Sequence, residues 1–133
     1  MPQVPGGRRR THPRDRFSVP QQVFNLPETI ETLRNEADSG QHGHRQMTLY
    51  KHGPATVALF LFEQTGANLR EHSTDGFVTI HTLAGCLTVH AEGQTYSLPA
   101  HSLMTLAPNV PHDVVADEPS QMLLTVCLEE DDA

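Results

Sequence analysis

The sequence predicts an all-β fold, a small barrel or sandwich that follows one short helix. From residue 47 onward, residues alternate between apolar and polar or form short apolar runs, which are the two patterns typical of β-strands. Turn signals such as Gly85 and Glu92-Gly93 separate these runs about every eight to twelve residues, the spacing of a sandwich or barrel. The expected strands cover residues 47–51, 55–62, 67–72, 77–83, 86–91, 94–98, 102–106, 112–116 and 121–128.

The composition agrees with a single domain that has an aliphatic core. The chain has 133 residues, no Trp and only 5% aromatic residues, so its core must consist mainly of aliphatic side chains. At this length, folding buries roughly two-thirds of the surface of the unfolded chain. The two cysteines, Cys86 and Cys127, fall in expected strands and have neither CxxC nor zinc-type spacing. We therefore expect free, buried thiols.

The charge distribution excludes several classes of partner. The net charge is −7, and residues 17–133 contain four basic and fifteen acidic side chains. Such an acidic body argues against a nucleic-acid-binding surface. No apolar run approaches the roughly 20 residues of a membrane span, and the N-terminus lacks the apolar stretch of a secretory signal. We expect a cytoplasmic protein that binds neither nucleic acid nor a membrane.

Composition also divides the chain into four segments. The first is rich in Pro and Gly and contains Arg8-Arg9-Arg10, which is typical of a flexible arm. In the second, Asn25 suits the N-cap of a helix and Pro27 suits its first turn. We expect His42 and His44 in an exposed loop, although a His-Gly-His tract can also bind metal. The segments are the arm at 1–24, a helix and loop packing on the barrel at 25–45, the barrel at 46–128 and an acidic tail at 129–133.

Two histidines lie at expected junctions between turns and strands, within motifs that resemble a known superfamily. Gly66, followed after five residues by His72 and later by Gly85, fits the first motif of the cupins. The run Ala107-Pro108-Asn109-Val110-Pro111-His112 fits the end of their second motif. The chain thus resembles small single-domain, RmlC-like cupins over about residues 46–128. This resemblance implies a double-stranded β-helix, or jelly-roll, barrel in which His72 and His112 share a pocket.

Two positions that are glycines in the second cupin motif carry other residues here. His101 stands at the opening glycine position and Asn109 at the inner one. Such positions commonly need a positive φ angle, which Asn and His tolerate better than most residues. We therefore expect positive φ at both residues.

The first motif departs from the pattern of metal-binding cupins, in which two His and one Glu join the second-motif His around one ion. Thr74 occupies the place of the second His, and Val78 that of the Glu. The resemblance therefore implies a divalent metal (Fe, Mn, Ni or Zn) at His72 and His112 only if further ligands are recruited. If Val78 faces inward, strand alternation directs three nearby candidate ligands outward. These are His81, His90 and Asp113.

Three functions remain open, and the sequence leaves undecided whether the protein is an enzyme. The favoured one is a binding module for a small molecule, with a pocket formed by His72, Thr74, Val78, Ile80 and His112. The second is a metal-dependent enzyme of the oxygenase or isomerase type that uses His72 and His112 with recruited ligands. The third is metal-free acid–base catalysis by a histidine of near-neutral pKa.

The expected strand at 55–62 is too uniformly apolar to have one face in water. Its outer face should therefore meet either the N-terminal segment or another subunit. Many small cupins are similar in forming dimers through such sheets, and we predict a two-fold homodimer.

Overall fold

The computed structural model describes residues 20–36 and 43–129, with the backbone but not the side chain of His72. Most of the predicted arm (residues 1–19), His42 and the tail residues 130–133 lie outside the described residues. No described helix is long and apolar enough to span a membrane.

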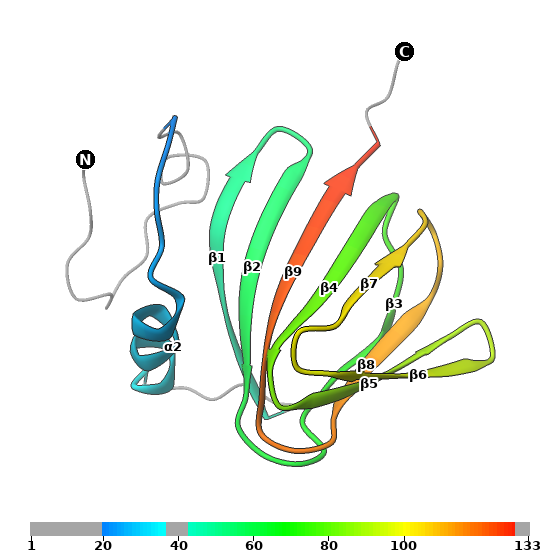
Figure 1. The fold of residues 1–133 in the computed structure, drawn as a ribbon. Helices are drawn as coiled ribbons and strands as arrows, with labels where there is room; N and C mark the ends of the chain where they lie inside the picture. The colour runs from blue at the N-terminus through cyan, green and yellow to red at the C-terminus, as the bar shows by residue number, and fades with distance from the viewer. Residues whose placement is uncertain (1–19, 37–42, 130–133) are drawn as a thin grey trace.

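The described chain forms one short helix and then nine β-strands (Figure 1). The elements are α2 (Leu26–Arg34), β1 (His44–His52), β2 (Ala55–Phe62), β3 (Asn68–His72), β4 (Gly76–Ala84), β5 (Cys86–Ala91), β6 (Gln94–Pro99), β7 (Leu103–Leu106), β8 (His112–Ala116) and β9 (Ser120–Leu128). One sheet has the strand order β1-β2-β9-β4-β7 and the other β3-β8-β5-β6, and all pairs are antiparallel. The all-β prediction is confirmed.

The strand boundaries agree with those predicted to within one residue, except at the start of β1. That strand begins at His44 rather than at residue 47, because its pairing with β2 continues to the partners His44 and Phe62. The prediction that His44 belongs to an exposed loop is therefore wrong. The described part of the loop before it contains only Gly43.

The main core lies between the two sheets and is formed by the inward faces of both. It includes Phe60 and Phe62 from β2, Ile80 from β4 and Val89 from β5, each at most 4% exposed. Alternation along each strand directs these residues to one face. The core is mostly aliphatic, as the composition predicts.

A second core covers the outer face of the five-stranded sheet. Ile30 and Leu33 of α2 are 2% and 0% exposed, and they pack in one cluster with Leu59 and Leu61 of β2. Phe24, which was predicted to belong to the flexible arm, packs against this cluster. Strand β2 is thus buried on both faces by its own chain. We expected the outer face of β2 to meet either the N-terminal segment or another subunit, and in the structure the N-terminal segment packs against it.

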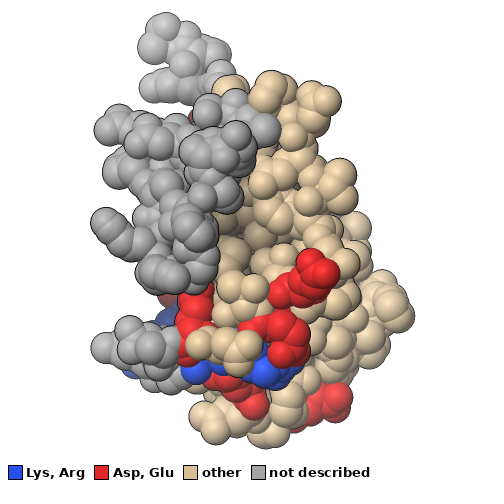
Figure 2. Space-filling view, turned by 90° about the vertical axis from the view of Figure 1, so that its left-hand side faces the viewer, with Lys and Arg blue, Asp and Glu red and all other residues tan. Residues whose placement is uncertain are grey.

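Local interactions hold α2 in this position. The Asn25 side chain accepts a hydrogen bond from the Glu28 amide at 3.0 Å, which confirms the predicted N-cap. Arg45 of β1 donates to the backbone carbonyls of Leu33 and Glu36, and it forms an ion pair with Glu63. Figure 2 shows acidic and basic side chains gathered on the lower part of this face, around the helix. The helix therefore presents a polar outer surface over an apolar contact.

Candidate functional site

The two turns of the second motif have the backbone conformation that the sequence predicts. His101 has a φ of 78° and Asn109 a φ of 66°. The Asn109 amide donates to the Thr74 carbonyl at 2.8 Å. With its side-chain nitrogen turned toward Thr74 and Asp75, Asn109 also donates to both, at 3.2 Å each. The loop before β8 is thereby fastened to the loop after β3, so the two histidine motifs lie side by side.

A β-bulge sets His72 opposite His112. Strands β3 and β8 pair regularly at Leu69 and Val114, and the register then shifts so that His72 becomes the partner of His112. A regular ladder would have placed Glu71 there, because two residues along one strand correspond to two along the other. The extra residue of the bulge therefore brings the two motif histidines together at the level of the backbone. The side chain of His72 is outside the described residues.

The imidazole of His112 is buried and held in one orientation. His112 is 1% exposed, and its Nδ1 lies 3.0 Å from the Val110 carbonyl oxygen. A carbonyl only accepts hydrogen bonds, so Nδ1 donates, and in a neutral imidazole the acceptor lone pair is then on Nε2. This arrangement is the one that orients histidines which bind metals or ligands through Nε2.

The other predicted pocket residues have different roles. The Thr74 hydroxyl donates to the Gly76 carbonyl at 3.0 Å, so it stabilises its own turn. Val78 and Ile80 face inward as expected, but they are 3% and 0% exposed and belong to the packed core. Their partners on β7, Leu106 and Met104, lie closer to open space because they line a cavity.

The described donor groups do not fit a closed metal site. Among the described side chains, which do not include that of His72, no group of three or more His, Cys, Asp or Glu could hold an ion. His90 Nδ1 lies 2.6 Å from Asp113 Oδ1, and this pair is on the outer face of its sheet, as predicted. His81 also alternates outward from Val78 and Ile80. Two imidazoles alone are too few ligands for a tight tetrahedral site.

The two cysteines have no disulfide partner in the described part of the chain. Cys86 and Cys127 are free, as predicted, but they are half-buried rather than buried. Loss of hydration is the main cause that raises the pKa of the Cys86 thiol, and the neighbouring Asp117 carboxylate adds to it. A thiol that is harder to ionise is a poor nucleophile, so a catalytic cysteine is not supported.

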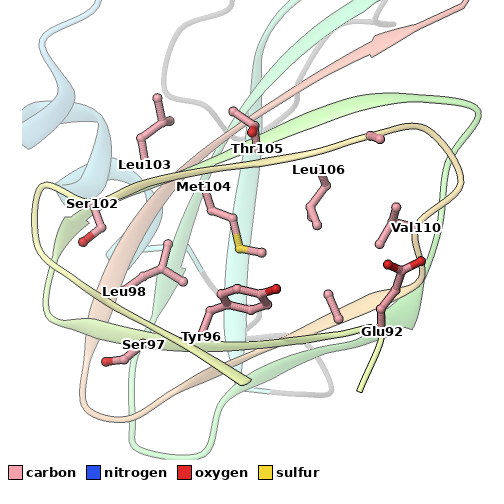
Figure 3. Close-up of a pocket in the computed structure, with 12 residues that line it drawn as sticks. Glu92, Tyr96, Ser97, Leu98, Ser102, Leu103, Met104, Thr105, Leu106 and Val110 are labelled. Atoms are coloured by element: carbon pink, nitrogen blue, oxygen red, sulfur yellow. The ribbon is translucent and has the colours of Figure 1, made fainter. Parts of the chain in front are cut away.

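A cavity lies between the edge strands β6 and β7. It has a volume of about 540 Å³, and Figure 3 shows Met104 and Leu106 of β7 pointing toward Tyr96 and Leu98 of β6. Its lining consists of Ala91, Glu92, Tyr96, Ser97, Leu98, Ser102, Leu103, Met104, Thr105, Leu106, Ala107 and Val110.

Two neighbours of His112 line this cavity. Its ladder partner on β5, Ala91, lines the cavity, and so does Val110, whose carbonyl accepts the hydrogen bond from Nδ1. Neither His112 nor any other residue of the predicted pocket is among the lining residues of this cavity. The sequence feature that could have pointed to this cavity is Tyr96, an aromatic residue three positions after the Glu92-Gly93 turn.

The sequence matches the model of the AraC-like ligand binding domain family over residues 56–127, more than half of the chain. The chain belongs to this family. No curated protein sequence matches the chain. Both histidine motifs and every strand except β1 lie almost entirely within the region that the family model covers.

Solved structures confirm the resemblance to cupins. A cupin superfamily protein from Desulfitobacterium hafniense is 19% identical, with a TM-score of 0.64 over 71% of this chain and 84% of its own. An RmlC-like cupin from Shewanella frigidimarina is 18% identical, with a TM-score of 0.62 over 69% and 82%. An RmlC-like cupin from Desulfovibrio desulfuricans is 18% identical, with a TM-score of 0.64 over 80% and 96%. At these identities the likeness establishes the jelly-roll fold alone.

Proposed function

We propose that this domain binds a small organic molecule in the cavity between β6 and β7, without chemical conversion. The observation that carries this proposal is the cavity itself. Its volume of about 540 Å³ lies within the range of roughly 300–1,000 Å³ that is typical of small-molecule sites. Membership in a family of ligand-binding domains supports the same function.

The lining has polar and apolar surface of similar extent, which supports a ligand with both an apolar body and polar groups. Leu98 and Leu106 are 4% and 6% exposed and form a fixed apolar floor. Met104 adds a flexible, polarizable side chain that adapts to different shapes. Ser102 and Thr105 contribute hydroxyl groups to the lining. Small-molecule sites commonly combine apolar surface with polar groups that orient the ligand.

The proposal is tested with a thermal-shift screen of metabolites, followed by calorimetric titration of those that raise the Tm. Tyr96→Ala should weaken the binding of such a ligand about fivefold or more, because it removes the largest aromatic surface of the lining. Tyr50→Ala is the matched control, since Tyr50 is the other of the two tyrosines and lies on β1. A screen in which nothing raises the Tm, or equal losses in both variants, would contradict the proposal.

The second candidate is a metal-dependent enzyme, with His72 and His112 as its first two ligands. Their opposed positions in the ladder and the hydrogen bond at His112 Nδ1 favour it. Fe, Mn, Ni or Zn would supply Lewis-acid or redox chemistry there, once further ligands were recruited. Metal analysis of untagged protein tests this candidate. Equimolar metal that is lost in His72→Ala would support it, and substoichiometric metal in both proteins would exclude it.

We also propose a two-fold homodimer, based on exposed apolar side chains of the five-stranded sheet other than those of β2. Helix α2 covers the outer face of β2, so that face no longer requires a partner subunit. The same sheet exposes Leu103 of β7 to 63% and Phe77 of β4 to 45%. Sedimentation should therefore give a species of about twice the 14.7 kDa chain mass. A single species at the chain mass would refute the dimer.

A further inference from the structure

We propose that the cavity between β6 and β7 selects organic cations, meaning an ammonium group carried by an apolar body. This inference rests on the proposed binding function and narrows the class of ligand. It follows from the charge of the lining, the position of one carboxylate and the nature of the side chains beside it.

The described lining carries a single charge, and that charge is negative. Among the twelve lining residues, Glu92 is acidic and none is Lys, Arg or His. The whole chain has a net charge of −7, so the surrounding field has the same sign. An acidic protein with an acidic cavity rim concentrates cations and repels anions. An anionic ligand would meet no basic side chain in the lining to offset this repulsion.

Glu92 is fixed at the rim by the backbone. It lies in the β5–β6 turn with a φ of 51°, and the last paired residues before this turn are Ala91 and Gln94. Figure 3 shows its carboxylate directed toward Val110, on the opposite side of the rim. The carboxylate forms no hydrogen bond or ion pair with any residue that the structure describes. Its charge is therefore available to a ligand.

Other side chains of the same lining suit an ammonium group on an apolar body. The Tyr96 residue is 42% exposed and lines the cavity, and a tyrosine ring face attracts a cation through its quadrupole. Figure 3 shows the Met104 sulfur next to the Tyr96 ring. Further inside, Leu98 and Leu106 provide the apolar floor for the body of the ligand.

The test compares three six-carbon probes that differ in charge: n-hexylammonium, 1-hexanol and hexanoate. Titrations are made by NMR at about pH 8, where imidazoles of ordinary pKa are neutral and the amine is protonated. Hexylammonium should bind at least about threefold more tightly than hexanol, and hexanoate should bind more weakly than both. The preference for the cation should shrink as salt is added, because ionic strength screens an exposed carboxylate.

Two variants assign this preference to residues. Glu92→Gln should reduce the ratio of the hexanol Kd to the hexylammonium Kd by about threefold. Glu118→Gln is the matched control, because it removes the same negative charge far from the cavity rim. Glu118 lies in the β8–β9 connection, near the Cys86 end of β5, whereas Glu92 follows the opposite end of that strand. The control should leave the ratio unchanged. Tyr96→Leu should also lower the ratio, and Tyr96→Phe, which keeps an aromatic face, should restore most of it.

The outcomes separate this inference from the proposed function. Hexanol or hexanoate that binds as tightly as hexylammonium would overturn the preference for cations and leave the binding site intact. An equal fall of the ratio in Glu92→Gln and Glu118→Gln would overturn the role of Glu92. Failure of all three probes up to about 10 mM would overturn both the site and its selectivity, since low-millimolar affinity is attainable with about seven non-hydrogen atoms.

Discussion

The two sheets face each other along two sides, which we call seams: at one, edge strand β1 faces edge strand β3, and at the other, β7 faces β6. The two seams differ in how their inner space is filled. At the seam between β1 and β3, His44 Nδ1 lies 3.0 Å from the Asn68 carbonyl, which links the two edges directly. The His44 ring also lies 5.7 Å from Phe60 and 5.9 Å from Phe62, measured between ring centroids. At the seam between β6 and β7, the same inward space is a cavity of about 540 Å³.

The difference shows that side chains at the edges, rather than the topology, decide where this fold can bind a ligand. The first seam is filled by three rings, two of them from the inward face of β2. The second has one half-exposed ring, Tyr96, and small residues such as Ala91 and Ser102 around it. We therefore expect the filled seam to contribute stability and the open seam to contribute binding, a division that is common in proteins.

The largest expected effect comes from emptying the filled seam. Phe62→Ala should lower the free energy of unfolding by about 3–5 kcal/mol, because Phe62 is 0% exposed and leaves a cavity in the main core. Urea denaturation measures the change. Tyr96→Ala at the open seam should cost less than about 1 kcal/mol, since Tyr96 is 42% exposed. Equal losses at the two seams would break the comparison.

The next effect concerns the link between the two edges. His44→Ala should destabilise the protein by about 1–2 kcal/mol, because the Asn68 carbonyl loses its donor and two ring contacts disappear. His52→Ala is the matched control, since His52 ends the same strand and is exposed. The control should change stability by less than about 0.5 kcal/mol. Equal changes in stability in the two variants would show that His44 does not stabilise the contact between β1 and β3.

The strands and the motif turns could be predicted because their signals are local. Alternation placed Val78 and His81 on opposite faces of their strand, and the motif spacing identified positive φ at His101 and Asn109. The bulge that brings His72 opposite His112 was not predicted, because it depends on pairing between distant segments. The cavity was missed for the same reason. Its volume results from what two edge strands leave unfilled, and no short run of sequence records that.

A smaller effect should come from Thr82, which lies on the inner face of β4 beside the open seam. Its amide donates to the carbonyl of Ser102, a lining residue, and its hydroxyl is fully buried without a hydrogen-bond partner among the described residues. Thr82→Val keeps the shape and removes this unsatisfied group, so it should stabilise the protein by about 1 kcal/mol.

The same change at Thr79, which alternates to the outer face of the strand, is the control for this substitution. Thermal and urea denaturation of both variants measure the difference. If Thr82→Val instead destabilises the protein, the hydroxyl has a partner in solution, and the open seam is polar to a greater depth than its lining indicates.

The smallest effect is a change in reactivity at Cys86, whose Sγ lies 3.8 Å from the Ser97 hydroxyl of the edge strand β6. Loss of hydration raises the pKa of this thiol, the hydrogen bond from Ser97 opposes the shift, and the Asp117 carboxylate adds to it. Because the raised pKa reduces the thiolate fraction, alkylation by iodoacetamide should have its pH midpoint above the ordinary 9.0.

The measurement is made in a Cys127→Ser background, so that only Cys86 reacts. Asp117→Asn should move the midpoint back toward 9.0, because it removes a negative charge that disfavours the thiolate. A midpoint at or below 9.0 in the parent protein would mean that β6 opens often enough to hydrate the thiol. The open seam would then owe its cavity to a loose edge strand as well as to its small side chains.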